Sequence, residues 1–332
     1  MPRLRSVRSR PRLVVALGGN AIQRAYDHGT WGESVRQMRR TARALANAVG
    51  PQRDLVVTHG NGPQVGLLLR EAELGASEVP PAPMHVLGAE TEGQIGYLIA
   101  QELGRALAGP RRRTVVPIVS QVEVDRADPA FRRPTKPVGR FYTAREADRL
   151  HRAEGWTLRP DAGRGGWRRV VPSPRPKRWI EGSAVRALLD AGAGAYCVFV
   201  VAGGGGIPVV PAADGFTGVD AVIDKDLGAA LVARTIGADT LVIVTDVPGA
   251  AVGYASVHPR WLGSVAPADL SRFWRRGEFA EGSMGPKVEA GLRFLRTGGR
   301  RFAITDTASL ADALRGRAGT RIWPRRLGGA ER

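Results

Sequence analysis

Short apolar runs of strand length alternate with longer amphipathic stretches along most of the chain. The runs have the continuous Val, Leu and Ile character of strands that are buried on both faces. We expect such strands at 12–17, 54–59, 114–124, 195–204, 240–247 and 301–306. Apolar residues recur at helical spacing through Val65, Leu68, Leu69 and Ala72, and also over 34–48, 92–108, 183–191, 227–236, 286–296 and 308–315. This alternation predicts an α/β fold with a mainly parallel sheet that is covered by helices on both faces.

Residues 123–180 interrupt this rhythm and are rich in Pro, Arg and Trp. Their Phe, Tyr and Trp side chains offer apolar anchors, which a flexible linker would lack. We therefore expect a small protruding subdomain, inserted into one domain that spans 12–323. Residues 1–11 are expected to form a basic disordered arm, and residues 324–332 a flexible tail.

The formal net charge is +18 on 332 residues, which at first sight is typical of a nucleic-acid-binding protein. The distribution of the charge argues against that class. Residues 1–12 carry +5 and residues 126–180 carry +10, so the rest of the chain carries only +3. The excess belongs to the arm and the insert, and we do not expect nucleic acid to be the main partner.

The remaining bulk features point away from membranes and from disulfides. No run approaches the ~20 apolar residues of a membrane helix, and the apolar stretch after the basic N-terminal residues is too short for a signal peptide. The single cysteine, Cys197, excludes an internal disulfide framework and suits a reducing compartment. We therefore expect a cytoplasmic protein without a membrane partner.

Three of the predicted strands end in glycine-rich turns, namely Gly18-Gly19-Asn20, Gly60-Asn61-Gly62 and Gly203-Gly204-Gly205-Gly206. Ligands of α/β sheets bind beyond the carboxyl ends of the strands. Helix N-termini at that edge present N–H groups and a partial positive charge to anions. Glycine also lets the backbone approach a phosphate closely. The three turns together predict a site for phosphate or carboxylate groups.

Familiar nucleotide-binding motifs do not explain these turns. The chain has no Gly-Lys pair and hence no Walker A loop, and it has no HRD and DFG pair of a protein kinase. A dinucleotide fingerprint that starts at Gly203 fails because its third glycine falls on Pro208. The five His are scattered, so we expect no metal site built from protein ligands alone.

The lysines are the most informative residues of the chain. Among 49 Lys and Arg, only four are Lys, at positions 136, 177, 225 and 287. Lys is a compact point charge on a slim stem, whereas Arg is a broad planar fork. Phosphoryl transfer depends on positioned cations, so a chain that otherwise uses Arg keeps Lys where a narrow cation must reach between two anions. We expect this role for Lys136, Lys225 and Lys287, whereas Lys177 has the plainest context. The two Asp that flank Lys225 are expected to orient it or to recruit Mg²⁺.

The chain resembles the carbamate kinases, a branch of the amino acid kinase superfamily. The resemblance extends over about residues 12–322 and is carried by VVALGGNAI, THGNGPQVG, GQIGY, PTKPVG, DAGRGGWRRVVPSPRP, GGGGIPVV, AVIDKDLGA and GSMGPKVEA. It implies a three-layer αβα sandwich with an open, mainly parallel sheet of about eight strands, a mobile lid formed by the insert, and usually a homodimer. It also implies reversible phosphoryl transfer between ATP and carbamate, with ADP and carbamoyl phosphate as the other pair, and a place in arginine metabolism.

The resemblance further implies residue roles. Lys136, Lys225 and Lys287 fall on the lysines that neutralise the transferred phosphoryl group. We expect the phosphate and carbamate site at Gly18, Gly19, Asn20, Gly60, Asn61, Gly62, Gly204 and Gly205. We expect nucleotide contacts at Asp224, Asp226, Thr245, Asp246, Met284 and Lys287, with Mg²⁺ held mainly by the phosphates of ATP or ADP.

Two features of the motifs bear on these roles. Where the family commonly has an acid and then an aromatic or aliphatic pair, this chain has Val247-Pro248-Gly249-Ala250. Pro248 removes a donor and fixes the backbone, so this loop departs from the family's pattern at the place where adenine or ribose contacts would be expected, and its effect on nucleotide binding stays open. The first turn has no Lys before its glycines, which favours the carbamate branch over acetylglutamate or aspartate kinases. Two alternatives stay open: a kinase of the same fold with another carboxylate or phosphate acceptor, and a non-enzymatic nucleic-acid binder.

Overall fold

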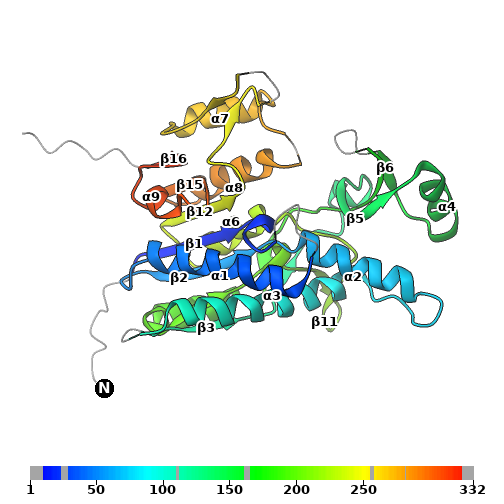
Figure 1. Ribbon diagram of the computed structural model, residues 1–332, viewed down its shortest axis with the longest axis horizontal. Coiled ribbons are helices and arrows are strands. Elements are labelled where there is room, and N and C mark those ends of the chain that lie inside the picture. The colour runs from blue at the N-terminus through cyan, green and yellow to red at the C-terminus, as the bar shows by residue number, and fades with distance from the viewer. Residues whose placement is uncertain are drawn as a thin grey trace, which may run out of the picture.

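A seven-stranded sheet forms the centre of the computed structural model (Figure 1), which describes residues 10–23, 29–109, 112–160, 165–254, 258–280 and 282–323. The strand order is β16-β15-β12-β1-β2-β9-β3, and every pair is parallel except β15 with β16. The expected open and mainly parallel sheet is thereby confirmed, with seven strands in the described ranges where about eight were expected. The bounds are β1 Arg12–Leu17, β2 Asp54–His59, β3 Thr114–Pro117, β9 Cys197–Val200, β12 Thr240–Thr245, β15 Arg301–Asp306 and β16 Thr320–Ile322.

Helices cover both faces of the sheet and complete three layers, as expected. Successive residues of a strand point to opposite faces. Val14 belongs to the buried core that contains residues of α5, α6 and α8, whereas Val15 belongs to the core that contains residues of α1, α3 and α9. The bounds of these helices are α1 Trp31–Ala48, α3 Met84–Ala106, α5 Gly182–Asp190, α6 Lys225–Thr235, α8 Met284–Arg296 and α9 Leu310–Leu314. Both faces of the central strands are therefore buried, which explains their uninterrupted apolar character.

The prediction of a single strand at 114–124 is wrong, because this segment contributes strands to two different sheets. Its first part is β3 of the large sheet, and its second part is β4 of a four-stranded sheet with the order β11-β10-β4-β8. Between them, the amide of Ser120 donates to a carboxyl oxygen of Glu92 at 2.7 Å instead of to a neighbouring strand. The bounds of the second sheet are β4 Gln121–Glu123, β8 Arg178–Trp179, β10 Ile207–Ala212 and β11 Gly215–Gly218.

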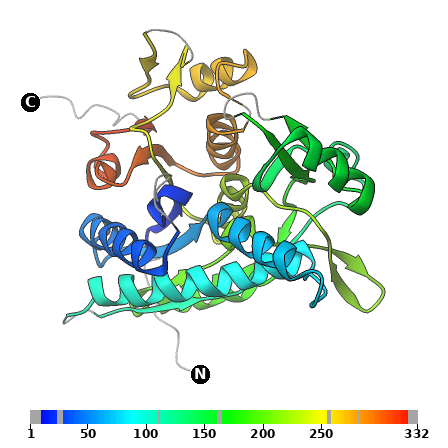
Figure 2. The ribbon, with the colours of Figure 1, turned by 45° about the vertical axis from the view of Figure 1, so that its right-hand side comes forward.

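Two groups of elements project from the three layers (Figures 1 and 2). The first, within the insert, is a three-stranded sheet in the order β5-β7-β6 with helix α4, and it packs on α2. The second contains the short strands β13 and β14 and helix α7. Their bounds are α2 Gly62–Gly75, α4 Ala144–Glu154, α7 Pro267–Arg275, β5 Lys136–Tyr142, β6 Leu158–Pro160, β7 Trp167–Val171, β13 Ala251–Val252 and β14 Arg260–Trp261.

The expected flexible tail, and all but the last two residues of the expected basic arm, lie outside the described residues. Within the described ranges, none of the helices combines the length and the apolar character that crossing a membrane requires.

Close packing between α8 and β15 gives a test of the fold. A Cβ atom added at Gly291 would lie 2.2 Å from the ring of the buried Phe302, whereas one added at Gly104 of α3 would meet no atom within 4 Å. We expect Gly291→Ala to lower the free energy of unfolding by about 1–3 kcal/mol through overpacking. Gly104→Ala should raise it by up to about 1 kcal/mol through helix propensity. Urea denaturation of both variants measures this, and equal effects would contradict the described packing.

Candidate active site

The carboxyl ends of neighbouring parallel strands bring the predicted turns together. Gly18 follows β1, Gly60 follows β2, and Thr245 ends β12 on the other side of β1. On one side of β1 the sheet continues through β2 and β9. On the other side it continues through the later strands β12 and β15. Such a reversal of strand order leaves a crevice at the carboxyl edge, where ligands of α/β proteins bind.

A cavity of about 650 Å³ lies at this edge. All three lysines singled out from the sequence line it, together with five of the eight residues predicted to bind phosphate or carbamate. The predicted residues in the lining are Lys136, Lys225, Lys287, Gly19, Gly60, Asn61, Gly62, Gly204, Asp224 and Asp226. The structure thus brings together side chains that are far apart in the sequence.

The carboxylate of Asp226 connects two of the lysines. Its Oδ1 accepts from the ammonium group of Lys225 at 2.5 Å, and its Oδ2 accepts from that of Lys287 at 3.0 Å. Asp226 is only 2% exposed, so the carboxylate depends on these two cations for its charge balance. One buried anion therefore fixes the separation of two cations that face the cavity.

The environment acts differently on the three groups. Burial would raise the pKa of Asp226, but Lys225 and Lys287 outweigh it and lower this pKa to about 2. Burial lowers the pKa of Lys225 below its ordinary value, with repulsion from Lys287 adding to the effect against the attraction of Asp226. For Lys287, burial also lowers the pKa, but the nearby carboxylates outweigh it and the net shift is upward.

Asp224 links the third lysine to the same helix. Its Oδ1 accepts from the amides of Asp226 and Leu227 and so caps the N-terminus of α6. Its Oδ2 accepts from the ammonium group of Lys136 at 2.8 Å. Lys136 begins β5 of the projecting subdomain, so this ion pair joins the insert to the first turn of α6.

At two positions of the cavity wall, only glycine leaves enough space for a neighbouring side chain. A Cβ atom at Gly60 would lie 2.9 Å from Cδ of Lys225, so glycine leaves space for the lysine stem. Gly204 has a φ of +65°, and a Cβ atom there would lie 2.4 Å from Nδ2 of the Asn61 side chain. Glycine at these positions therefore brings the lysine stem and two backbone turns to the same wall.

Electrostatics favour an anion in this cavity. Helices α2 and α6 begin at residues that line it, and Ser283, which also lines it, precedes α8. Each N-terminus contributes a partial positive charge. The lining also includes Arg70, Arg140 and Arg168, which sequence reasoning did not single out. Arg140 and Arg168 belong to the insert, whose many Arg residues were visible in the sequence. That composition did not indicate which of these side chains line the cavity.

Six predicted site residues lie outside the lining of the cavity, namely Gly18, Asn20, Gly205, Thr245, Asp246 and Met284. The amide of Gly18 donates to the carbonyl of Val244 at 2.9 Å, and the side chain of Asn20 donates to Asp246 at 2.9 Å. These contacts tie the ends of β1 and β12 together beside the cavity. Pro248 follows in an exposed turn.

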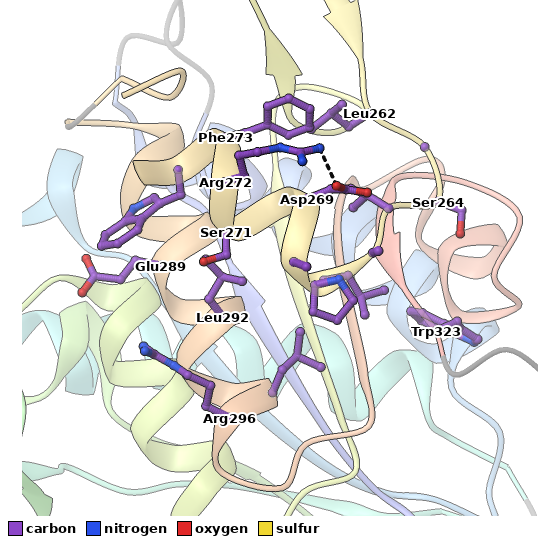
Figure 3. A pocket seen from close by; sticks show the side chains of 18 of the residues that line it. Leu262, Ser264, Asp269, Ser271, Arg272, Phe273, Glu289, Leu292, Arg296 and Trp323 are labelled. Atoms are coloured by element: carbon purple, nitrogen blue, oxygen red, sulfur yellow. Dashed lines mark hydrogen bonds and ion pairs between the residues drawn. The ribbon is translucent and has the colours of Figure 1, made fainter. Parts of the chain in front are cut away.

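Size alone would identify a different site. A larger groove of about 1270 Å³ lies between α7, α8, residues 260–267 and the chain near Trp323. Figure 3 shows its walls, with Arg272 paired to Asp269 on α7 and with Leu292 and Arg296 on α8. None of the site residues predicted from the sequence lines it. Convergent cations and helix N-termini, rather than volume, therefore identify the candidate site.

No group of three or more His, Cys, Asp or Glu side chains in the described ranges has an arrangement that could hold a metal ion.

The chain is similar to known proteins over nearly its whole length. The model of the amino acid kinase family matches residues 11–306. A carbamate kinase from Pyrococcus horikoshii is 44% identical over 319 residues, covering 94% of this chain and 99% of that protein. A carbamate kinase from Trichomonas vaginalis is 42% identical, covering 94% and 99%. The structure of a carbamate kinase from Giardia lamblia bound to AMP-PNP superposes with a TM-score of 0.84 at 39% identity, covering 94% of this chain and 98% of that one.

The shared carboxylate leads to a prediction about stability. Asp226→Asn leaves Lys225 and Lys287 without their common anion, and we expect the free energy of unfolding to fall by about 3–5 kcal/mol at pH 7. The lowered pKa of Asp226 means that its stabilising effect is present above the unfolded value of ~3.9 and is lost as the pH falls through about 2. The difference in the free energy of unfolding between the wild type and Asp226→Asn, measured by urea denaturation, should therefore shrink as the pH falls from 4 to 2.

Asp312→Asn, which removes an exposed ion pair with Arg315, is the control and should have no measurable effect on stability. A difference that does not change with pH would contradict this assignment.

Proposed function

The chain belongs to the amino acid kinase family and is a kinase, and we propose that it transfers a phosphoryl group reversibly between ATP and carbamate. Carbamoyl phosphate and ADP are the partners on the other side of the reaction. The similarity to carbamate kinases over nearly the whole chain supports this choice of substrate. The observation that carries the proposal is the arrangement of three lysines and two aspartates around one cavity.

The main barrier in this reaction is repulsion between two anions. In the ATP-forming direction, an oxygen of the terminal phosphate of ADP attacks the phosphorus atom of carbamoyl phosphate. The bond from phosphorus to the carbamate oxygen breaks, and carbamate leaves as an anion. No proton has to move, so the reaction needs no general base. It needs cations and N–H groups at the positions where negative charge lies in the transition state.

The lysines meet this need in different ways. Asp226 holds Lys225 and Lys287 at a fixed separation, so little reorganisation is needed when the phosphoryl group moves between the two anions. Lys136 reaches the cavity from the insert, and we propose that it joins the transferred group when the insert closes as a lid. The turns that contain Gly60 and Gly204 would receive the carbamate and phosphate oxygens.

We further propose that ATP and ADP bind beside the cavity, between the carboxyl end of β12 and the N-terminus of α8, with contacts to Thr245, Asp246 and Met284. The structure of the Giardia lamblia carbamate kinase bound to AMP-PNP supports nucleotide binding by this fold. The carboxylates of Asp224 and Asp226 already accept from lysines and from backbone amides. They therefore suit the orientation of lysines better than the binding of Mg²⁺, which the nucleotide phosphates would hold. When bound, the ion reduces the charge of those phosphates.

The family resemblance also leads us to propose a homodimer, a cytoplasmic location and a place in arginine metabolism. The single cysteine fits a reducing compartment.

Incubation of the protein with Mg-ADP and carbamoyl phosphate tests the function directly. We expect ATP to form, detected by luciferase, because the cavity offers positive charge to both anions. Acetyl phosphate in place of carbamoyl phosphate is the control and should give little ATP. If acetyl phosphate or another acyl phosphate is the better donor, the protein is a kinase of the same fold with a different acceptor.

Lysine-to-arginine exchanges test the need for slim cations. Lys225→Arg and Lys287→Arg should each lower kcat by about 10²–10³-fold with a smaller change in KM, because their contacts strengthen in the transition state. Lys177→Arg is the matched control, since Lys177 is 52% exposed and pairs only with Asp125 in the described ranges. Turnover close to that of the wild type in either active-site variant would refute the proposed roles.

A further inference from the structure

Glu92 of α3 is a buried carboxyl group that pairs with no cation among the residues that the structure describes. It is 4% exposed, and its Oε2 accepts from the amide of Ser120 at 2.7 Å. Its Oε1 is also buried and has no hydrogen-bond partner in the described part of the chain. Further along the same helix, Glu102 is also buried but pairs with Arg39 at 2.8 Å and with Arg105. The two acids therefore lie in opposite electrostatic environments.

These environments shift the pKa values of the two acids in opposite directions. Burial raises the pKa of Glu92 well above its ordinary value, the Ser120 amide opposes this only in part, and the carboxylate of Glu181 adds to the rise. The hydrogen bond from Arg39 lowers the pKa of Glu102 in spite of its burial. His59, which like Glu92 lies against Gly203, is neutral as well, since burial lowers its pKa to about 4. Burial and the lack of a paired cation in the described ranges thus favour the neutral form of Glu92, in contrast to Glu102.

Ser120 donates its backbone amide to Glu92 and, with two other atoms, binds both ends of the turn of residues 202–207. Its hydroxyl oxygen accepts from the amide of Ala202 at 2.9 Å, and its carbonyl oxygen accepts from the amide of Ile207 at 2.8 Å. The residues between these two points form the glycine-rich turn, and α3 packs against it. One residue at the junction of β3 and β4 therefore determines where the turn begins and ends.

The turn has a backbone conformation that needs such support. Ala202 has a φ of +48° and is the one residue other than glycine with a positive φ in the described ranges. Left-handed backbone is unfavourable for a residue with a side chain, and it persists where the surroundings determine it. Gly204, two residues later, lines the cavity of the lysines. The hydrogen bonds of Ser120 thus hold a strained backbone beside the candidate active site.

We propose that Glu92 is a positioning residue that acts as a neutral acid and, through Ser120, holds the turn of residues 202–207 in the conformation that receives the carbamoyl group. This role rests on the proposed function, because the bound group is the carbamate part of carbamoyl phosphate. Glu92 touches no reacting atom, and its effect reaches the cavity through the amide of Ser120 and the backbone of Ala202.

Four variants test this proposal by kinetics. Glu92→Gln keeps a neutral acceptor for Ser120, so kcat and both KM values should stay within about twofold of the wild type. Glu92→Met removes the acceptor of the Ser120 amide. Ser120→Ala removes the acceptor of the Ala202 amide and, with it, the hydrogen bond that the hydroxyl donates to the carbonyl oxygen of Ile118. Each variant should raise the KM for carbamoyl phosphate by about tenfold, with the KM for ADP unchanged. Adding Ala202→Gly to Ser120→Ala should restore part of the loss, because glycine adopts the left-handed backbone without support.

Two further readouts do not depend on catalysis, so they remain informative if the protein acts on another substrate. Hydrogen exchange of residues 202–207 should be faster in Glu92→Met and in Ser120→Ala, but not in Glu92→Gln. The Tm of Glu92→Gln relative to the wild type should rise from pH 4 to pH 8, because a raised pKa makes the wild-type acid lose stability as the pH rises. Glu102→Gln is the matched control on the same helix, and it should lower Tm at pH 8 without changing exchange at residues 202–207.

The proposal is overturned if Glu92→Gln impairs carbamoyl phosphate binding or exchange as strongly as Glu92→Met, since the charged form would then be required. It is also overturned if Ser120→Ala leaves both the KM for carbamoyl phosphate and the exchange of residues 202–207 unchanged.

Discussion

The candidate site depends on one buried carboxylate that is shared by two ammonium groups. Two lysines at the wall of one cavity repel each other, and without an anion between them they would separate or lose a proton. Asp226 supplies that anion on the first turn of a helix whose cap, Asp224, holds the third lysine. The strength of this arrangement is that every charge has a fixed partner before a substrate arrives.

The rest of the fold serves to place this helix end opposite the glycine-rich turns. Strands β12, β1, β2 and β9 are neighbours and parallel, so their carboxyl ends open on one side. Helices α6 and α8 cover the same face of the sheet and contribute Lys225 and Lys287 from their first turns. The glycines let lysine stems and backbone turns approach one another. A cavity for anions follows from the strand order together with these small residues.

Much of this was predictable from the sequence. The α/β fold followed from apolar periodicity, and the scarcity of Lys pointed to the three residues that the structure brings to one cavity. Helix α4 was missed because its sequence is mostly polar, although Thr143 and Glu146 form the capping box that marks its start. The break at Ser120 was missed because apolar residues continue on both sides of it, and the partner that ends the strand, Glu92, lies on the preceding helix α3. Contacts of that kind depend on tertiary packing, which periodicity does not encode.

The pairing of Lys136 with Asp224 has a consequence for the order of events in the site. The two oxygens of the Asp224 carboxylate make different contacts. One caps the N-terminus of α6, and the other accepts a hydrogen bond from Lys136 of the insert. In the mechanism proposed above, an arriving phosphate takes Lys136 away from the partner that it already has, and the released oxygen of Asp224 then faces the same anion. On this proposal, binding is an exchange of counterions rather than a simple addition of charge. Such an exchange discriminates against weakly charged ligands, because only a strongly anionic group can compete with the carboxylate for the cation.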